Sequence, residues 1–477
     1  MSRTQGMSRT REQKASHSTH GPRGEKKLGV IFLNTNSTEQ HTEQNSSQQG
    51  SRQQSSNKQS SRQQSSRQQG SRQQSSWKNK WTVAAIPALL IHVSIGTVYC
   101  WSSFSESLSA EVGVPTATLG WAFSLAIFFL GMSAAFAGSF VEHNIHKASL
   151  ISCICFTLGM IGTGVTAQYT QQLGPTASLI LIFLFYGVIM GVGLGIGYIT
   201  PVKTLMLWFA ENKGLGTGIS IMGFGLAKAI ASPVMNTLQD NVGLATMFYI
   251  LGGVYFVMML VGHFLLEKPA GFSEDKTAST RPDFSIFKNA KFAGIWVMFY
   301  LNITCGLALI SYEKSILKVM GVGIAVISLV QMLTATSNAL GRLGYSMLSD
   351  YMKDRNTVYL IIFATSALVS LLIFAFGGLN ASTLMLILVV LALLTVNAGY
   401  GGGFSTLPAL LSNSFGMTKI SGIHGIALSA WAIAGLTGNQ ITAAVLNLTG
   451  SYNAVFLILA VLYGVALLIS ATVVRAK

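Results

Sequence analysis

Lys228 is the residue best placed to do chemistry, because it is a charged side chain in the middle of an apolar run, GFGLAKAIAS. A charge at the centre of a membrane costs about 2.5–3.5 kcal/mol on insertion scales, so it faces a protein interior or a cavity. No acidic residue lies at that depth in the other apolar runs, so we expect Lys228 to meet an anion. The alternative is a structural lysine that is neutral or is held by backbone carbonyls.

Polar and aromatic side chains share helical faces in other apolar runs, where they must point to protein or water. Histidine and tyrosine can donate hydrogen bonds to a carboxylate, and aromatic rings can surround a small planar anion. Each has a structural alternative, since amides also join helices and aromatics also fill cores. The candidate substrate-binding residues are Lys228, His92, Tyr99, Tyr198, Gln331, Asn338, Tyr400, Trp431 and His424.

The elements that position these residues are predicted to be membrane helices. Half of the chain is hydrophobic, only 10% is charged, and the mean hydropathy is +0.50. Runs of about 20 apolar residues can span a bilayer, and we count twelve. The loops on the side of the two termini carry most of the Lys and Arg outside the tail, which predicts that both termini are cytoplasmic. The fold class is therefore all-α and polytopic.

A glycine-rich unit occurs twice. The stretch 191–218 has a partial echo at 397–422, in which glycines repeat at every second position and a proline follows. Duplicated membrane halves are typical of transporters. Small residues also let helices approach closely, so we expect these two segments to pack tightly against neighbours that move.

The chain divides into four predicted parts. Residues 1–80 form a Ser-, Arg- and Gln-rich tail with 14 basic and 4 acidic residues, which supplies +10 of the net charge of +15. Such a sequence is expected to be disordered. It could touch anionic lipid or weakly bind nucleic acid, although a dispensable extension is the favoured interpretation. Two six-helix bundles, 81–266 and 291–477, follow on either side of a polar linker, 267–290.

Several motifs resemble the oxalate/formate antiporter family of the major facilitator superfamily. They are Gly193-x-Gly195-x-Gly197-Tyr198-x-x-Pro201, the helix 1 pattern Gly96-x-x-Tyr99-x-Trp101, and GYGGGFSTLPALL followed by IHGIALSAWAIAG. Two loops also look like the superfamily's gating element, with an acid followed five residues later by a base. The resemblance implies a major facilitator fold, and it assigns gating or helix packing to Gly193, Gly195, Gly197, Pro201, Glu142, Lys147, Arg342, Asp350 and Arg355.

The resemblance implies a carrier of small carboxylates that works by alternating access, as a monomer and without a cofactor. Oxalate-transporting members place one base in the eighth membrane span and one in the eleventh. Here the interior of the eighth span, which begins near Val322, shows amides and a threonine, and Trp431 stands in the eleventh, which begins near Ile420. A monocarboxylate such as formate, acetate, lactate or pyruvate is therefore favoured over oxalate. Exchange or facilitated passage is favoured over proton symport, because Glu106 and Glu313 are expected near the outer surface.

Other classes of protein fit less well. An enzyme would need clustered nucleophiles, acids or metal ligands at depth, and the glycine run follows no predicted strand, so it is no dinucleotide site. A neutral-solute or drug carrier and a non-transporting receptor stay as alternatives. The expected partners are a small carboxylate and membrane lipid, with no specific nucleic acid, in a plasma membrane or a bacterial inner membrane.

Overall fold

The computed structural model describes residues 78–475 apart from 273–280, 378 and 380–381. The predicted disordered tail therefore lies almost wholly outside the described residues. Within them all regular structure is helical, and twelve helical spans are long and apolar enough to cross a membrane. The predicted all-α polytopic fold is confirmed, and the chain is a multi-pass integral membrane protein.

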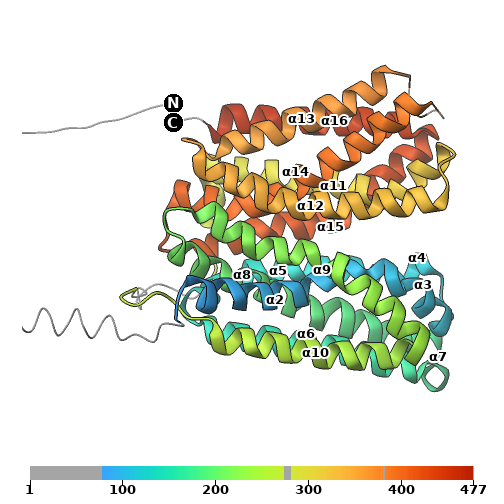
Figure 1. Cartoon of the computed structure of the whole chain (residues 1–477), viewed down its shortest axis with the longest axis horizontal. Coiled ribbons are helices and arrows are strands. Elements are labelled where there is room, and N and C mark those ends of the chain that lie inside the picture. Colours follow the sequence, from blue (N-terminus) through green and yellow to red (C-terminus); the bar gives the residue numbers. More distant parts are fainter. Residues whose placement is uncertain (1–77, 273–280, 378, 380–381, 476–477) are drawn as a thin grey trace, which may run out of the picture. The chain divides into compact units, whose positions relative to one another are not determined.

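The first bundle consists of the spans that precede the linker (Figure 1, blue to green). Its elements are η1 (Trp81–Ala85), α2 (Ile86–Gly96), η2 (Thr97–Cys100), α3 (Trp101–Val112), α4 (Thr116–Leu119), α5 (Trp121–His143), α6 (Ile145–Gln168), α7 (Thr170–Ile182), η3 (Phe183–Met190), α8 (Gly191–Trp208), α9 (Lys213–Val242) and α10 (Leu244–Leu265). Gly174 has φ +75°, a conformation that suits glycine, and it bends the chain where the fourth span begins.

The second bundle follows the linker (Figure 1, yellow to red). Its elements are η4 (Phe284–Lys288), α11 (Ala290–Val319), α12 (Ile324–Tyr351), α13 (Asn356–Ala375), α14 (Thr383–Phe415), α15 (Ile420–Thr449), α16 (Tyr452–Ile469) and η5 (Ser470–Val474). We call the end of both bundles that carries the linker the linker end, and the other the far end. Pro201 lies inside α8 and Pro408 inside α14, so the repeated sequence unit forms matching helices.

The two bundles meet along two diagonal helix pairs, α5 with α15 and α9 with α12. Small residues allow these helices to approach closely. A Cβ on Gly131 of α5 would lie 2.6 Å from the backbone of α15, and a Cβ on Gly225 of α9 would lie 2.9 Å from Arg342 Nε of α12. Glycine is therefore required where one bundle slides or rocks on the other.

The repeated glycines of α8 pack tightly, as expected, but against neighbours within their own bundle. A Cβ on Gly193 would lie 2.7 Å from Phe156 N of α6, and one on Gly195 would overlap the carbonyl of Leu130 in α5. Gly197 faces Ser152 of α6. All these neighbours belong to the first bundle, so the glycine run of α8 holds that bundle together.

Candidate functional site

Arg342 of α12 lies at the centre of the interface between the bundles and is fully buried. Its guanidinium carbon is 5.6 Å from the ring centroid of Phe224 in α9 and 5.4 Å from that of Phe404 in α14. Nε donates to Asn338 Oδ1 at 3.0 Å, and Nη1 donates to the carbonyl of Ile221 at 3.4 Å. The cation is thus held between aromatic faces of both bundles.

Four aromatic rings meet here and are named the aromatic box: Tyr198, Phe224, Phe404 and Trp431. Phe224 and Phe404 are the two that face the guanidinium. The ring centroids of Tyr198 lie 5.5 Å from both Phe224 and Trp431, and those of Phe404 and Trp431 are 4.5 Å apart. Two rings come from each bundle. At these distances neighbouring rings are in direct contact, so the four form one aromatic cluster between the bundles.

Two tyrosines join the bundles next to the box. The hydroxyl groups of Tyr99 and Tyr400 are 3.1 Å apart, and their rings pack against Phe224 and Phe404 at 5.2 Å and 5.1 Å. The charge of Arg342 acts on both phenol groups. The predicted aromatic surroundings of the site therefore exist, with Tyr99, Tyr198, Tyr400 and Trp431 among them.

Three buried hydrogen-bonding groups around the box make no hydrogen bond within 3.5 Å to a described residue, although the Arg342 side chain interacts with the Tyr198 hydroxyl over a longer distance. They are the Tyr198 hydroxyl, Arg342 Nη2 and Trp431 Nε1. A buried polar group without a partner costs about 1–3 kcal/mol, and native structures contain few of them. All three can donate.

Arg342 was expected in the gating loop, and that placement is wrong. Helix α12 continues for nine residues beyond it, to Tyr351, which is about 13 Å at 1.5 Å per residue. No Asp or Glu oxygen of a described residue lies within 4 Å of its guanidinium. Arg342 is therefore an unpaired buried cation, the role that the sequence had suggested for Lys228.

His92 and His424 were predicted to bind the substrate, and the structure gives His92 another role. His92 is fully buried, its Nε2 is 3.0 Å from the carbonyl of Tyr198, and its Nδ1 pairs with the Ser220 hydroxyl. Both ring nitrogens are engaged, so His92 positions Tyr198 and has no nitrogen left for a substrate. His424 is also buried, its Nε2 has no partner, and its ring lies 6.2 Å from that of Tyr198.

Lys228 lies half-buried on α9, and its charge acts on Glu313 of α11. Glu313 was expected near the outer end of its span, and it stands six residues before the end of α11 at Val319; it is nevertheless buried, with only 4% of it exposed. The sequence interpretation did not predict that this acid would interact with Lys228. Gln331 is exposed, and Asn338 accepts the hydrogen bond from Arg342, so that amide orients the cation.

The linker end is closed by two similar acid contacts, which we call the latch. Glu142 of α5 accepts from the backbone N–H of Ser421 at 2.7 Å, at the start of α15. Asp350 of α12 accepts from the backbone N–H groups of Gly214 and Leu215, both at 2.8 Å, at the start of α9. Each acid thus binds the positive end of a helix dipole in the other bundle.

The bases of the latch are only partly those predicted. Arg355 pairs with Asp350 at 2.7 Å and also donates to Ser349 Oγ at 2.8 Å, as the loop motif suggested. In the first bundle Glu142 pairs with Lys203 of α8, and Lys147 is exposed. The five-residue spacing therefore identified one pair correctly and missed the other, whose base lies 61 positions away.

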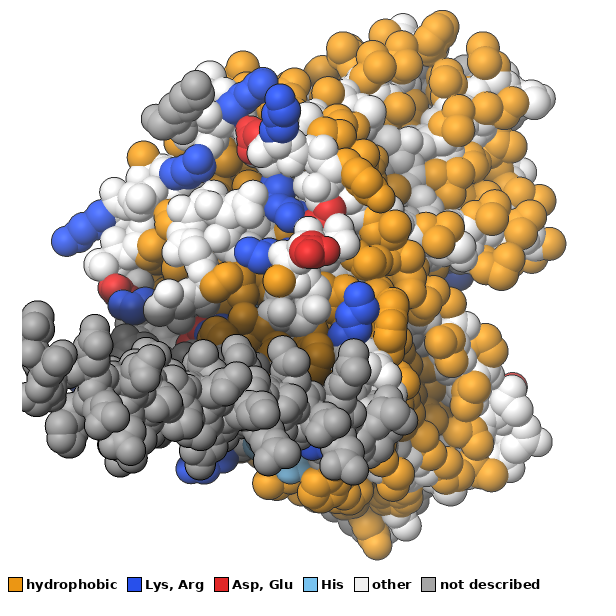
Figure 2. Space-filling view, turned by 60° about the vertical axis from the view of Figure 1, so that its left-hand side comes forward, with side chains coloured by type: hydrophobic (Ala, Val, Ile, Leu, Met, Phe, Trp, Pro, Cys, Tyr) orange, Lys and Arg blue, Asp and Glu red, His pale blue; other side chains and the backbone are white. Residues whose placement is uncertain are grey.

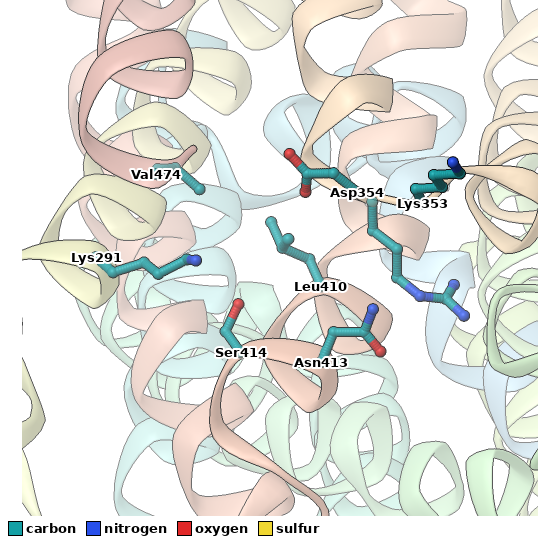
Figure 3. Close-up of a pocket in the computed structure, with 8 residues that line it drawn as sticks. Lys291, Lys353, Asp354, Leu410, Asn413, Ser414 and Val474 are labelled. Atoms are coloured by element: carbon teal, nitrogen blue, oxygen red, sulfur yellow. The ribbon is translucent and has the colours of Figure 1, made fainter. Parts of the chain in front are cut away.

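A cavity of about 270 Å³ lies at the linker end of the second bundle (Figure 3). Figure 3 shows the Lys291 ammonium directed into it, toward Leu410 and Asp354. The cavity is lined by Lys291, Lys353, Asp354, Arg355, Leu410, Asn413, Ser414 and Val474. All of these belong to one bundle, so the cavity supports the latch and is not a site between bundles.

Phe224, Glu313 and Lys203 are the residues of the site and latch that the sequence interpretation missed. Phe224 stands between two glycines in GFG, which is a signal for close packing around a ring. Glu313 stands beside a lysine in SYEK and therefore resembles a surface pair. Lys203 follows Pro201 closely, inside a helix.

Comparison with known proteins agrees with this geometry. The model of the Major Facilitator Superfamily matches residues 88–439. An uncharacterized MFS-type transporter, YhjX, of Escherichia coli is 27% identical over 73% of this chain and 84% of its own length. The oxalate:formate antiporter of Oxalobacter formigenes is 22% identical over 80% and 88%, and apicoplast pyruvate carrier 1 of Toxoplasma gondii is 23% identical over 73% and 81%.

Solved structures show the same fold. The Escherichia coli fucose:proton symporter has a TM-score of 0.64 at 14% identity, covering 82% of this chain and 98% of its own. A bacterial homologue of the iron transporter ferroportin, in its outward-facing state, has a TM-score of 0.65 at 13% identity, covering 81% and 97%. With its two six-helix bundles, central buried cation and latch, this chain belongs to the Major Facilitator Superfamily of transporters.

Proposed function

We propose that this transporter carries a small monocarboxylate between the two bundles. The observation that supports this most is Arg342, a fully buried cation with no carboxylate within 4 Å and with an unpartnered Nη2. A planar guanidinium binds a carboxylate through paired hydrogen bonds. Tyr198 and Trp431 supply two further donors beside it.

The single positive charge at the aromatic box favours a substrate with one carboxylate group over a substrate with two. Arg342 is the cation that contacts its rings, and Trp431 occupies the helix position where oxalate carriers are expected to place a second base. The relatives named for oxalate and formate and for pyruvate support the small-carboxylate class. Formate, acetate, lactate and pyruvate are the proposed cargo, with oxalate a weaker candidate.

The linker end is proposed to face the cytoplasm. Lys and Arg gather on the face turned toward the viewer in Figure 2, whereas hydrophobic side chains cover the sides. Membrane proteins place such basic loops on the cytoplasmic side. With the latch closed there, we expect the site to open toward the far end, where Glu106 and Gln331 are exposed. Transport then requires the latch to break while the far end closes.

Counterflow in proteoliposomes tests the proposal. Purified protein is reconstituted with formate, acetate, lactate, pyruvate or oxalate inside, and uptake of each labelled acid is measured. We expect saturable exchange of at least one monocarboxylate. Arg342→Ala should reduce it by about 100-fold, because the truncation removes a charge-assisted bidentate contact worth roughly 3 kcal/mol.

The matched control is Arg281→Ala, which removes an exposed arginine of the linker and should leave exchange unchanged. Full exchange by folded Arg342→Ala would contradict the role of Arg342 and favour a neutral solute as cargo. If folded wild-type protein exchanges no acid at all, the proposed function is wrong, and a non-transporting receptor becomes the better interpretation.

A further inference from the structure

Glu313 is a buried carboxyl group that the proposed transport site leaves unused. It lies on α11, 4% exposed, with Oε1 2.8 Å from the hydroxyl of Thr334 in α12. No Lys or Arg nitrogen of a described residue lies within 4 Å of it. An ionised carboxylate in such surroundings is costly unless it is paired or protonated.

The contact with Thr334 can serve both protonation states of this carboxyl group. The Thr334 hydroxyl is 2.8 Å from Glu313 Oε1 and 3.0 Å from the backbone carbonyl of Gln331. A hydroxyl has one proton to donate and can also accept. When Glu313 is ionised, the hydroxyl donates to it. When Glu313 is protonated, its own O–H donates to Thr334, and the hydroxyl turns to Gln331.

One charged group acts on Glu313 from the opposite bundle. Lys228 of α9 lies within electrostatic range of the carboxyl group and makes no ion pair within 4 Å with a described residue. On α11 itself, Lys314 and Lys318 are exposed. An ionised Glu313 therefore offsets the charge of Lys228, whereas a neutral Glu313 leaves that charge free.

The other helices packed against α11 add little charge near this site. They are α12, α14, α15 and α16, and the last three contain no Asp, Glu, Lys or Arg. The short elements η4 and η5 pack on α11 at the linker end, far from Glu313. The titratable groups on those four helices are Arg342, Tyr345, Asp350, Tyr351, Tyr400, His424, Tyr452 and Tyr463.

We propose that Glu313 binds the proton that travels with the anion, so that this carrier is a proton-linked symporter and not only an exchanger. The inference rests on the proposed function, since it requires an anion at Arg342. A proton from the far side adds to the Glu313 carboxylate, and the freed Lys228 attracts the anion. When the bundles rock so that the site opens to the linker end instead, Glu313 gives up its proton and the anion leaves with it. Each ligand then raises the affinity for the other by the same factor.

Two assays on the same proteoliposomes test this. The first assay is counterflow at equal pH inside and outside, which involves no net movement of protons. The second is uptake into vesicles with an acidic exterior, in which a symporter moves protons inward together with the anion. The acid used is the one that wild-type protein exchanges fastest, and protein-free vesicles correct for passage of the undissociated acid. For wild-type protein, we expect the acidic exterior to raise uptake by about fivefold or more, the usual lower range of coupling between two sites.

Glu313→Gln should keep counterflow and lose this stimulation, because glutamine copies the protonated form. The matched control is Glu111→Gln, an exposed glutamate of α3, which should behave as wild-type protein in both assays. Equal stimulation of Glu313→Gln and wild-type protein would overturn the inference while leaving the proposed function intact. Absence of counterflow from wild-type protein would overturn both.

Thr334→Val provides a second test of the inference if Glu313→Gln does not fold. Valine has the shape of threonine but removes the shared hydroxyl, so the pH at which gradient-driven uptake is half-maximal should shift. Thr334→Ser retains the hydroxyl and should restore the wild-type pH profile. An unchanged profile in folded Thr334→Val would contradict the inference.

Discussion

The latch and the aromatic box both contain buried charges, but the charges of the latch are paired with opposite charges and that of the box is not. In the latch, Glu142 has Lys203 and a backbone N–H group, and Asp350 has Arg355 and two backbone N–H groups. In the box, Arg342 has rings, an amide and a carbonyl, but no counter-ion. The difference indicates that paired charges hold a conformation, while an unpaired charge is kept for a ligand.

Lys203→Ala should give the largest effect, and it concerns stability. Both members of the pair are almost fully buried, and removing one partner of a buried pair costs about 3–5 kcal/mol because the other charge is left alone. We expect a clear fall in the thermal unfolding midpoint in detergent. A midpoint equal to that of wild-type protein would show that the paired charge of the latch does not stabilise the fold, and the proposed difference between latch and box would be wrong.

Arg342→Met should show the opposite combination. Methionine fills similar volume without charge, so the unpaired cation is lost and nothing buried loses its counter-ion. We expect the thermal midpoint to be unchanged or higher, while counterflow falls by about 100-fold. A large loss of stability together with normal exchange by the remaining folded protein would assign Arg342 to structure.

Trp431→Phe tests a single unpartnered donor of the box. Phenylalanine keeps a ring beside Phe404 and Tyr198 but lacks the indole N–H, which has no hydrogen-bond partner within the described part of the chain. One hydrogen bond is worth about 1 kcal/mol, so KM for the anion should rise by about fivefold with little change in stability. An unchanged KM would show that this N–H does not contact the substrate.

Lys147→Ala should have the smallest effect. The side chain is exposed and is not the partner of Glu142, which pairs with Lys203. Substitutions at such surface positions usually change the free energy of unfolding by less than about 0.5 kcal/mol. A latch role for Lys147 would instead reduce the thermal midpoint as strongly as Lys203→Ala does.

The fold was predictable from the sequence because it depends on properties that are local. Apolar length defined the membrane helices, and the linker between 267 and 290 has the polar composition that separates two groups of six spans. The repeated Gly and Pro pattern predicted matching helices, and α8 and α14 confirm them. None of these required knowledge of which helices touch.

The candidate site was only partly predictable because it depends on contacts between distant segments. The aromatic residues of the box were identified from shared helical faces, but Phe224 was not. Arg342 was assigned to gating because it stands close in the sequence to a predicted loop. Helix α12 continues to Tyr351, so Arg342 lies well inside the helix. Glu313 was judged by its sequence position near a helix end, and burial by neighbouring helices cannot be deduced from that position.

The latch acids bind main-chain N–H groups at Ser421, Gly214 and Leu215. Every residue except proline supplies such a group, so the hydrogen bonds to the acids do not themselves depend on the side chains of Ser421 and Leu215. Gly214 differs, because a Cβ there would overlap the backbone carbonyl of Ser346 in α12. A substitution as small as Gly214→Ala would therefore separate α9 from α12 and weaken the closed linker end without touching either acid.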